Sequence, residues 1–251
     1  MTELAKLAWP DVVKLLEKGC AAILPVGATE AHGPHLPLDT DVTIALGMAR
    51  RACQQLEEKG RACVVLPPIS YGVAEYAGPF AGTISLSEST ATSYLRDILL
   101  ATIKTGFDPV AVANAHLEPA HIATIAQAID DVRSSSSTEV VFPDITRRPL
   151  AQRLSEEFQS GACHAGQYES SLVLSDDPTA VNEDKRQQLP PVDISLVDAI
   201  RAGQKDFIEA GGDMAYFGQP AEASAEEGAT TFQILADILV EGIEAQASPN
   251  D

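Results

Sequence analysis

Cationic residues are scarce in this chain of 251 residues. It carries 17 Lys and Arg against 36 Asp and Glu, which gives a net charge of −19. A chain this acidic repels a phosphate backbone and an anionic bilayer surface, so neither a nucleic acid nor a membrane is an expected partner. Cysteine is also scarce: the four cysteines form no C-x-x-C pair, which argues against a disulfide framework and favours reduced thiols.

Several sequence patterns are missing as well. No run reaches the roughly 18 apolar residues of a membrane span, and the N-terminal segment lacks the basic start and apolar core of a secretory signal. We therefore expect a cytoplasmic protein. The nucleophile elbow, the P-loop and the dinucleotide fingerprint are absent, so a serine hydrolase, a P-loop NTPase and a dinucleotide dehydrogenase lack support. The only tryptophan, Trp9, is expected in the core.

Short apolar runs alternate with longer amphipathic stretches along the chain. The runs are rich in Val, Ile and Ala, which is typical of strands buried on both faces of a parallel sheet. The expected strands are residues 21–26, 62–66, 109–113 and 139–143, and the expected helices are 42–59, 87–105, 119–133, 195–210 and 224–245. This alternation predicts an α/β fold with a mostly parallel central sheet and helices on both faces. We find no linker or repeat, so 1–251 is expected to be a single domain.

Local signals indicate where four of these helices begin. Thr40 and Ser87 are expected N-caps, and Pro119 suits the first turn of its helix. Ser224 is followed three residues later by Glu227, which is the pattern of a capping box.

Three polar clusters carry the candidate chemistry. The densest, TEAHGPHLPLDTD at 29–41, follows the first expected strand and places two histidines and three acids within twelve residues. NAHLEP at 114–119 follows the third expected strand, and HAGQYES at 164–170 adds another His and Glu. Loops after strand C-termini line the ligand crevice of an open α/β sheet, so the first two clusters lie where a site is expected.

The spacing within the clusters points to metal ions. His116 and Glu118 are two residues apart, so in extended backbone their side chains point the same way, and Glu30 and His32 share that spacing. Together the clusters would bring four carboxylates into one crevice: Glu30, Asp41, Glu118 and Glu169. Two like charges ~4 Å apart repel by roughly 4 kcal/mol at an effective dielectric near 20. Mixed imidazole and carboxylate ligands without thiolate favour Zn or Mn, and five or more ligands suggest two metals that share a carboxylate.

Simpler interpretations exist for individual residues. Either acid–histidine pair alone fits an ordinary polar contact, and only the two pairs together favour a metal site. His35 fits a loop wall, and His121, early in its expected helix, fits a structural role. Cys163 beside His164 is a weak candidate for a nucleophile, because sequence neighbours usually point apart and no second base is evident.

These segments resemble the motifs of the creatininase (creatinine amidohydrolase) family. LPVGATEAHGPHLPLDTD looks like the family hallmark, NAHLEP and HAGQYESS are similar to its second and third motifs, and YGVAEYAGPFAGTISLS resembles a further loop. The similarity runs through about residues 8–183. It implies a three-layer α/β/α sandwich, two divalent metal ions per chain (Zn or Mn), hydrolysis of a C–N bond, and a homo-oligomer that is often a hexamer.

The resemblance also assigns roles to individual residues. The implied metal ligands are Glu30, His32, Asp41, His116 and Glu118. Asp41 would bridge the metals, with Glu30 and His116 at one of them and His32 and Glu118 at the other. His164 would protonate the leaving nitrogen, and Glu169 would be a further ligand or a proton-handling group. The expected substrate-binding residues are Tyr71, Tyr76, Gly82 and Thr83.

The residues around the implied metals depart from the family pattern. Ala74, Tyr76 and Ala77 stand where the loop often has Ser, Glu and His. The expected substrate is therefore a small cyclic amide or formamide, without specificity for creatinine, attacked by a metal-bridged hydroxide. Alternatives are a formamide deformylase of a pyrimidine nucleotide precursor, with Arg147 and Arg148 as candidate phosphate-binding residues, and a peptidase of a small modified peptide. A phosphoesterase and a non-catalytic metal- or ligand-binding protein are the rivals from other classes.

Overall fold

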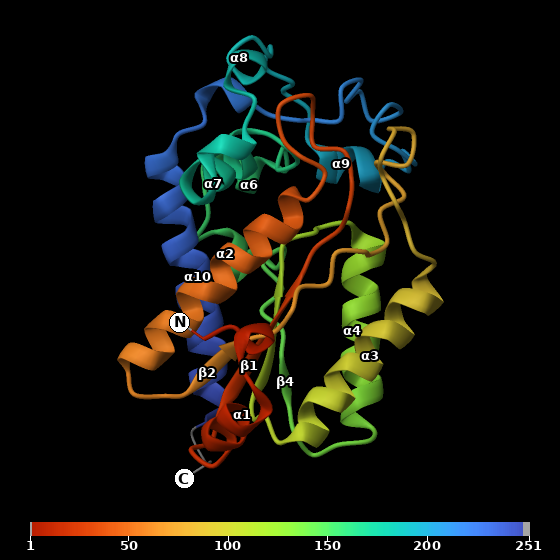
Figure 1. Cartoon of the computed structure of the whole chain (residues 1–251). Coiled ribbons are helices and arrows are strands. Elements are labelled where there is room, and N and C mark those ends of the chain that lie inside the picture. Colours follow the sequence, from red (N-terminus) through yellow and green to blue (C-terminus); the bar gives the residue numbers. More distant parts are fainter. Residues whose placement is uncertain (1, 248–251) are drawn as a thin grey trace.

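The computed structural model, which describes residues 2–247, is built on a four-stranded parallel sheet (Figure 1). The strand order is β2-β1-β3-β4, and every neighbouring pair is parallel. The strands are β1 (Ala21–Val26), β2 (Cys63–Val65), β3 (Val110–Asn114) and β4 (Val140–Val141). The predicted parallel sheet is confirmed. The two edge strands are shorter than the apolar runs that suggested them, because only these residues pair with the central strands.

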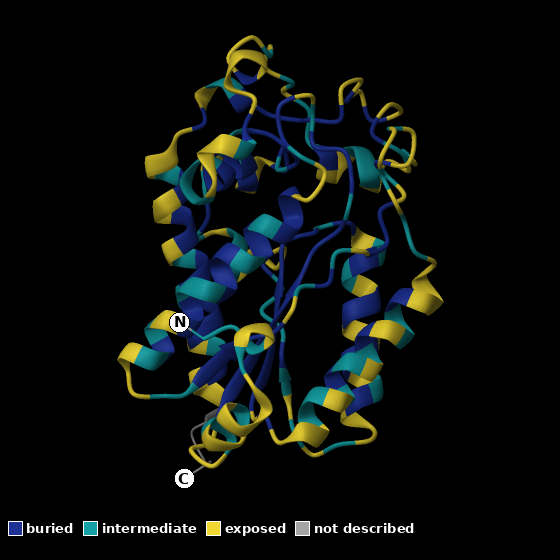
Figure 2. Ribbon diagram, viewed as in Figure 1, coloured by how far each residue is buried: buried dark blue, intermediate teal, exposed yellow. Residues whose placement is uncertain are grey.

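The sheet lies between two layers of helices. On one side are α2 (Thr40–Glu58) and α10 (Ala225–Ala247), and on the other are α3 (Glu88–Thr105) and α4 (Pro119–Arg133). Successive strand residues point to opposite faces, so Ile23 packs in the α2/α10 core and Leu24 in the α3/α4 core. Figure 2 shows buried residues along the strands and along the inner faces of these helices. The predicted α/β class with helices on both faces is confirmed.

Shorter elements precede the sheet or lie beyond its carboxyl-terminal edge. The chain begins with η1 (Leu4–Lys6) and α1 (Trp9–Leu16). After β4 come α5 (Arg148–Ala151), α6 (Glu156–Ser160), α7 (Gln167–Asp176), η2 (Pro178–Ala180), α8 (Glu183–Arg186), α9 (Leu196–Arg201) and η3 (Pro220–Glu222). Of these, α6 to α9 gather above the ends of the strands in Figure 1. Across residues 2–247, no helix combines the length and apolar character that crossing a bilayer requires.

Three of the predicted helix starts are confirmed. The Ser87 hydroxyl accepts a hydrogen bond from the backbone N–H of Thr90, and Pro119 stands in the first turn of α4. The Ser224 hydroxyl accepts a hydrogen bond from the N–H of Glu227 at 3.2 Å. The two serine hydroxyls therefore cap their helices as predicted. The second half of the capping box is not formed, because the backbone N–H of Ser224 donates to the hydroxyl of Ser171 and not to Glu227.

Three other expectations are wrong. Thr40 is the first residue of α2 and not its cap, because its hydroxyl donates a hydrogen bond to the carbonyl of Pro37. The helix expected over 195–210 is reduced to the short α9, and Gly203, two residues after its end, has a φ of 92°, which turns the chain away from a helical path. Trp9 is 78% exposed on α1 and not in the core.

Close packing of α10 against α7 leads to a stability prediction. A Cβ on Gly228 of α10 would overlap the carbonyl of Ser171 in α7. Gly228→Ala is therefore expected to lower the free energy of unfolding by about 2 kcal/mol, since overpacking outweighs the gain in helix propensity. Denaturant unfolding measures this, with Ala229→Ser on the exposed face of the same helix as the control. Equal stability of both variants would contradict the prediction.

Candidate metal centre

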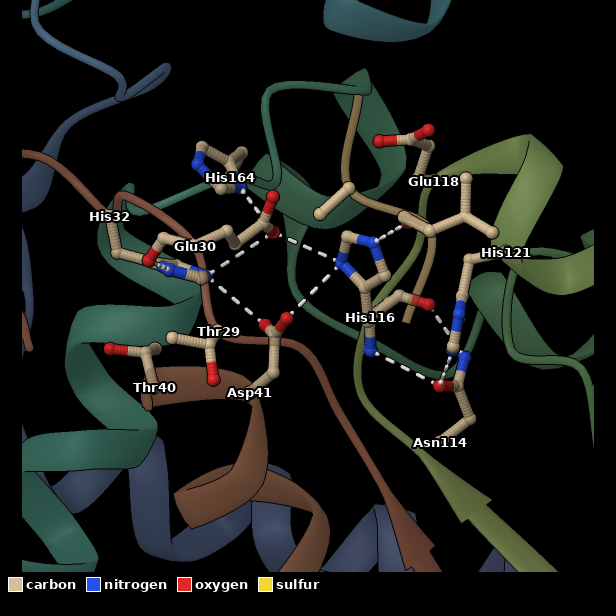
Figure 3. A network of polar contacts seen from close by, with 12 residues as sticks. Thr29, Glu30, His32, Thr40, Asp41, Asn114, His116, Glu118, His121 and His164 are labelled. Atoms are coloured by element: carbon tan, nitrogen blue, oxygen red, sulfur yellow. Dashed lines mark hydrogen bonds and ion pairs between the residues drawn. The ribbon is translucent and has the colours of Figure 1, made fainter. Parts of the chain in front are cut away.

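Polar side chains from separate segments meet at the carboxyl-terminal edge of the sheet (Figure 3). All of them are buried, with no more than 7% of any residue exposed. They are Glu30 and His32 on the loop after β1, Asp41 in the first turn of α2, His116 after β3, and His164 and Glu169 before and within α7. All six were expected at one site, and those from the β1 and β3 loops agree with the rule that loops after parallel strands form the crevice.

His32 faces three carboxylates. Its Nε2 lies 3.1 Å from Asp41 Oδ1, 3.5 Å from Glu169 Oε2 and 3.9 Å from Glu30 Oε1. Glu169 is held in place by a hydrogen bond that its Oε2 accepts from the backbone N–H of Ala165. The loop after β1 and helix α7 are therefore joined at this ring.

His116 faces the same aspartate from the other side. Its Nδ1 lies 3.0 Å from Glu30 Oε1 and 3.1 Å from Asp41 Oδ2. Asp41 thus directs one oxygen to each histidine and lies between the two groups. His164 Nδ1 lies 3.9 Å from Glu30 Oε1 and completes this cluster.

Each of these histidines has one ring nitrogen that faces the carboxylates, the inner nitrogen, and one that faces away, the outer nitrogen. The outer nitrogen donates a hydrogen bond to a backbone carbonyl. The pairs are His32 Nδ1 with Glu30 O at 3.1 Å, His116 Nε2 with Val73 O at 2.7 Å, and His164 Nε2 with Ala31 O at 3.0 Å. A carbonyl only accepts, so the outer nitrogen carries the proton, and in the neutral ring the inner nitrogen presents a lone pair. Lone pairs therefore face carboxylate oxygens, an arrangement that requires a cation or extra protons between them.

The site residues fit divalent metal ions. Three sets of ligand atoms each lie within 4.8 Å of one another: Glu30–Asp41–His116, His32–Asp41–Glu169 and Glu30–His32–His164. Glu30 Oε2 and Asp41 Oδ2 are buried and accept no hydrogen bond, although Asp41 Oδ2 is close to the His116 ring. Unsatisfied carboxylate oxygens beside imidazole nitrogens suit zinc or manganese. The first two sets share Asp41, as a bridging ligand would.

The protonation of the metal-free site reflects the same crowding. Burial disfavours the charged ring of His32, but the carboxylates of Asp41, Glu169 and Glu30 outweigh it and raise its pKa to about 10. Burial raises the pKa of Glu169 to about 8, despite the nearby His32. Burial would also raise the pKa of Asp41, but the histidines on either side hold it well below its usual range. Protons thus occupy positions that cations would take.

These pKa shifts predict how the metal-free protein responds to pH. The folded-state pKa of His32 is about 10 against an ordinary value of 6.5. Its contribution to the free energy of unfolding is therefore complete below pH 6.5 and lost as the pH rises through about 10. The pKa of Glu169 is raised to about 8, so its contribution to the free energy of unfolding also decreases as the pH rises. We expect the melting temperature to fall over this range without metal and to fall less with bound zinc, which displaces these protons. A rise in the metal-free protein would contradict this.

Glu118 lies apart from the three ligand sets. Its carboxylate accepts hydrogen bonds from the backbone N–H groups of Glu75 at 3.2 Å and Tyr76 at 3.1 Å. Burial raises its pKa to about 7, and the charges that act on it belong to His116 and Glu30. Glu118 therefore stands on the His116 side of the cluster. The acid beside His32 is Glu169, whereas the family resemblance implied Glu118 for that place.

Asn114 is a supporting residue that was not among the site residues predicted from the sequence. Its Nδ2 donates to the carbonyl of His116 at 2.6 Å, and its Oδ1 accepts from the backbone N–H of His116 and the ring Nε2 of His121. It thereby fixes the backbone that presents His116 and gives His121 a structural contact. Its place two residues before His116, at the end of β3, is the signal that could have identified it.

A cavity of about 540 Å³ opens onto the cluster. Tyr76 lines it, as expected for a substrate-binding residue, with Leu117 and Phe207 among the apolar walls. The other residues expected to bind substrate, Tyr71, Gly82 and Thr83, are not among the residues that line it. Tyr71 is 47% exposed, and the Thr83 hydroxyl accepts a hydrogen bond from the N–H of Ala31. Cys163 lines the cavity, but burial raises the pKa of its thiol to about 12, which argues against a nucleophile.

Known proteins match this chain over nearly its whole length. The family model of creatininase, described as creatinine amidohydrolase, matches residues 5–243. A mycofactocin precursor peptide peptidase of Mycobacterium ulcerans is 28% identical over 243 residues, which cover 94% of this chain and 85% of the relative. The creatinine amidohydrolase of Pseudomonas putida is 25% identical over 259 residues, covering 95% and 93%.

Solved structures share the fold. A crystal structure of creatinine amidohydrolase superposes with a TM-score of 0.79 at 24% identity, covering 99% of both chains. A manganese form of creatininase superposes with a TM-score of 0.76 at 22% identity, covering 99% of both chains. A mutant creatininase of a Zn-Zn type has a TM-score of 0.72 at 21% identity, covering 98% of both chains.

Proposed function

The chain belongs to the creatininase family, and from that premise we propose that it hydrolyses a C–N bond of a small cyclic amide or formamide, with two divalent cations bound per chain. The observation that carries the proposal is the pair of ligand sets that share Asp41. Membership in a family of hydrolases and the buried histidine–carboxylate cluster support the enzymatic class. The cations proposed are zinc or manganese, which suit the mixed donor set.

The proposed ligands divide around Asp41. Glu30, Asp41 and His116 would hold one cation, with Glu118 beside them, and His32, Asp41 and Glu169 would hold the other. Bound cations act as Lewis acids that polarise a substrate carbonyl and make a water molecule more acidic. The protein residues hold these positions: backbone carbonyls orient the histidine rings, and the Ala165 N–H orients Glu169. Burial of the cluster excludes bulk water from the reacting groups.

His164 is proposed to move the proton that the reaction requires. Its Nε2 is held by the carbonyl of Ala31, so Nδ1 is the nitrogen available on the cavity side. In the metal-free protein, burial and the charge of His32 lower the pKa of His164 to about 4. Burial, the larger cause, would persist with cations bound and favours a neutral ring. Nδ1 can therefore accept a proton from the attacking water and deliver it to the departing nitrogen.

Replacing His164 tests this role. His164→Gln is expected to lower kcat by about a hundredfold or more, since general acid–base catalysis contributes about 10²–10⁴-fold. The metal content is expected to stay at the wild-type value, because His164 is absent from both sets that share Asp41. Cys163→Ser, the neighbouring cavity residue, is the control and should retain activity within a few-fold. Loss of metal from His164→Gln would instead make His164 a ligand.

A peptidase acting on a short modified peptide is the second candidate. The cavity volume of about 540 Å³ lies in the range of pockets for drug-sized ligands and exceeds what a creatinine-sized ring would fill. The curated relatives at 28% identity are described as mycofactocin precursor peptide peptidases. The deformylase alternative required Arg147 or Arg148 to bind a phosphate. Arg147 is a poor candidate, because its guanidinium pairs with Asp144 at 2.9 Å and its side chain does not line the cavity.

Elemental analysis is the first test of the proposal. Freshly purified protein is expected to contain about two zinc or manganese ions per chain, and His116→Ala should lose one of them and most of its activity. Asp198→Asn, which changes an exposed acid that also lines the cavity, is the control and should keep both metal ions and its activity. Metal-loaded protein is then screened against cyclic amides, formamides and short peptides. Absence of metal after soaking in zinc or manganese, or an unchanged His116→Ala variant, would overturn the proposal.

A further inference from the structure

One arginine differs from all the others in its contacts. The chain has ten arginines, all within residues 2–247, and nine of them donate a side-chain hydrogen bond or form an ion pair. Within that described range, the guanidinium of Arg148 has no such partner. Arg148 is exposed, so its guanidinium is left to water or to a ligand.

Arg148 lies in the wall of the cavity that contains the candidate metal centre. It begins α5, the first short helix after β4. The cavity lining includes one other cationic side chain, that of Arg201 in α9, and no lysine. Arg201 is 3.3 Å from Asp198, which lines the cavity as well, so its charge is already partly balanced. Arg148 therefore supplies an uncompensated positive charge to the cavity wall.

The charges of this cavity are unevenly arranged. Its acidic residues other than Asp198 belong to the candidate metal centre: Glu30, Asp41, Glu118 and Glu169. These acids are buried, whereas Arg148 is exposed and lines the same cavity. The apolar walls include Leu117, Phe158 and Leu196. A ligand with a carbonyl at the metal end and an anionic group at the other end would match both regions.

We propose that the substrate carries an anionic group, a carboxylate or a phosphate, remote from the scissile C–N bond and bound by Arg148, with Arg201 as a weaker second contact. Guanidinium presents several N–H donors in a planar fork, which matches either oxyanion in a bidentate arrangement. The inference rests on the proposed hydrolytic function and narrows its substrate class. A small neutral cyclic amide without such a group would leave Arg148 unused.

Hydroxamates with variable tails provide the test. A hydroxamate chelates zinc through two oxygens, so it anchors the probe at the metal centre of the zinc-loaded protein. Dicarboxylic acid monohydroxamates of increasing chain length are compared with the matching monoamide hydroxamates, which differ only in the charge of the tail. At the best chain length, the acid tail is expected to bind about tenfold more tightly than the amide tail. This preference should weaken at high salt.

Variants at three arginines locate the effect. Arg148→Gln should reduce the acid-to-amide preference to near one without changing the affinity for the amide probe. Arg201→Gln should reduce it by less than about twofold, because that side chain is exposed and paired with Asp198. Arg147→Gln is the matched control: it changes the adjacent arginine, which pairs with Asp144 outside the cavity lining, and should leave the preference intact.

The outcomes separate this inference from the proposed function. Equal affinity for the two tails in the wild-type protein, or a preference that survives Arg148→Gln, overturns the inference alone. Failure of zinc-loaded protein to bind any hydroxamate contradicts the metal hydrolase itself, and the inference falls with it. Phosphonate tails then distinguish the two sources of the charge, since tighter binding of the phosphonate indicates a phosphate and tighter binding of the acid indicates a carboxylate.

Discussion

Asp41→Asn is expected to remove both metal ions and to lower kcat/KM by at least about a thousandfold. Asp41 lies between the two histidines, with Oδ1 3.1 Å from His32 and Oδ2 3.1 Å from His116. An amide offers one oxygen and no negative charge, so it cannot serve both positions. Losing a single neutral donor at an active site already costs about 10²–10³ in kcat, and loss of the cations removes more charge than that.

The matched control for this variant is Asp39→Asn. Asp39 immediately precedes α2, two residues before Asp41, is exposed and belongs to none of the ligand sets. It should retain about two metals per chain and full activity. Metal content by elemental analysis and turnover under the same conditions measure both variants, and far-UV circular dichroism checks that each is folded. An Asp41→Asn protein that still held two metals would refute the bridging role.

Glu169→Gln is expected to lose the metal on the His32 side and to lower activity about a hundredfold to a thousandfold. Glu169 Oε2 lies 3.5 Å from His32 Nε2 and takes part in the set with Asp41. Glutamine keeps the shape of the side chain and the contact with the Ala165 N–H but removes the charge. One metal per chain should remain, held by the set that contains His116. Retention of two metals would contradict this assignment.

Comparing Glu118→Gln with Glu169→Gln shows which of these two acids binds the metal on the His32 side. Glu118 stands near His116 and Glu30, so its loss should leave the His32-side metal in place. A double-mutant cycle sharpens the comparison. His32→Ala combined with Glu169→Gln should cost no more metal than either change alone, whereas His32→Ala combined with Glu118→Gln should show independent effects. The opposite pattern would restore the pairing of Glu118 with His32 that the family resemblance implied.

The fold was largely predictable because its core follows local rules. The helix over 119–133 and the strand over 21–26 match the structure to the residue, since Pro119 and continuous burial define them. The region after β4 was harder to predict. The helix expected over 195–210 stops at Arg201, because the chain there packs as short turns over the cavity and not as one amphipathic face.

The site was predictable as a set of residues but not in its pairing. Glu30, His32 and His116 follow buried strands, and parallel strands bring their ends together. The spacing of two residues predicts only that the side chains of Glu118 and His116 lie on the same side of the backbone. In the structure, Glu118 lies on the His116 side of the cluster. Glu169 comes from α7, whose position depends on packing against α10, and no local pattern encodes that contact. The residues of α5 and α9 that line the cavity could not be predicted either, because their position also depends on tertiary packing.

The outer hydrogen bonds of the three histidines bear on how such a protein can evolve. Each runs to a main-chain carbonyl, of Glu30, Ala31 or Val73, and a carbonyl is supplied by any amino acid. Mutations at Ala31 or Val73 that preserve the backbone path leave the ring orientations unchanged. Side chains around the cavity are therefore free to diverge while the ligand geometry is inherited. Substitutions in the cavity wall can therefore change the substrate preference of proteins with this scaffold. No intermediate that lacks the catalytic centre is needed.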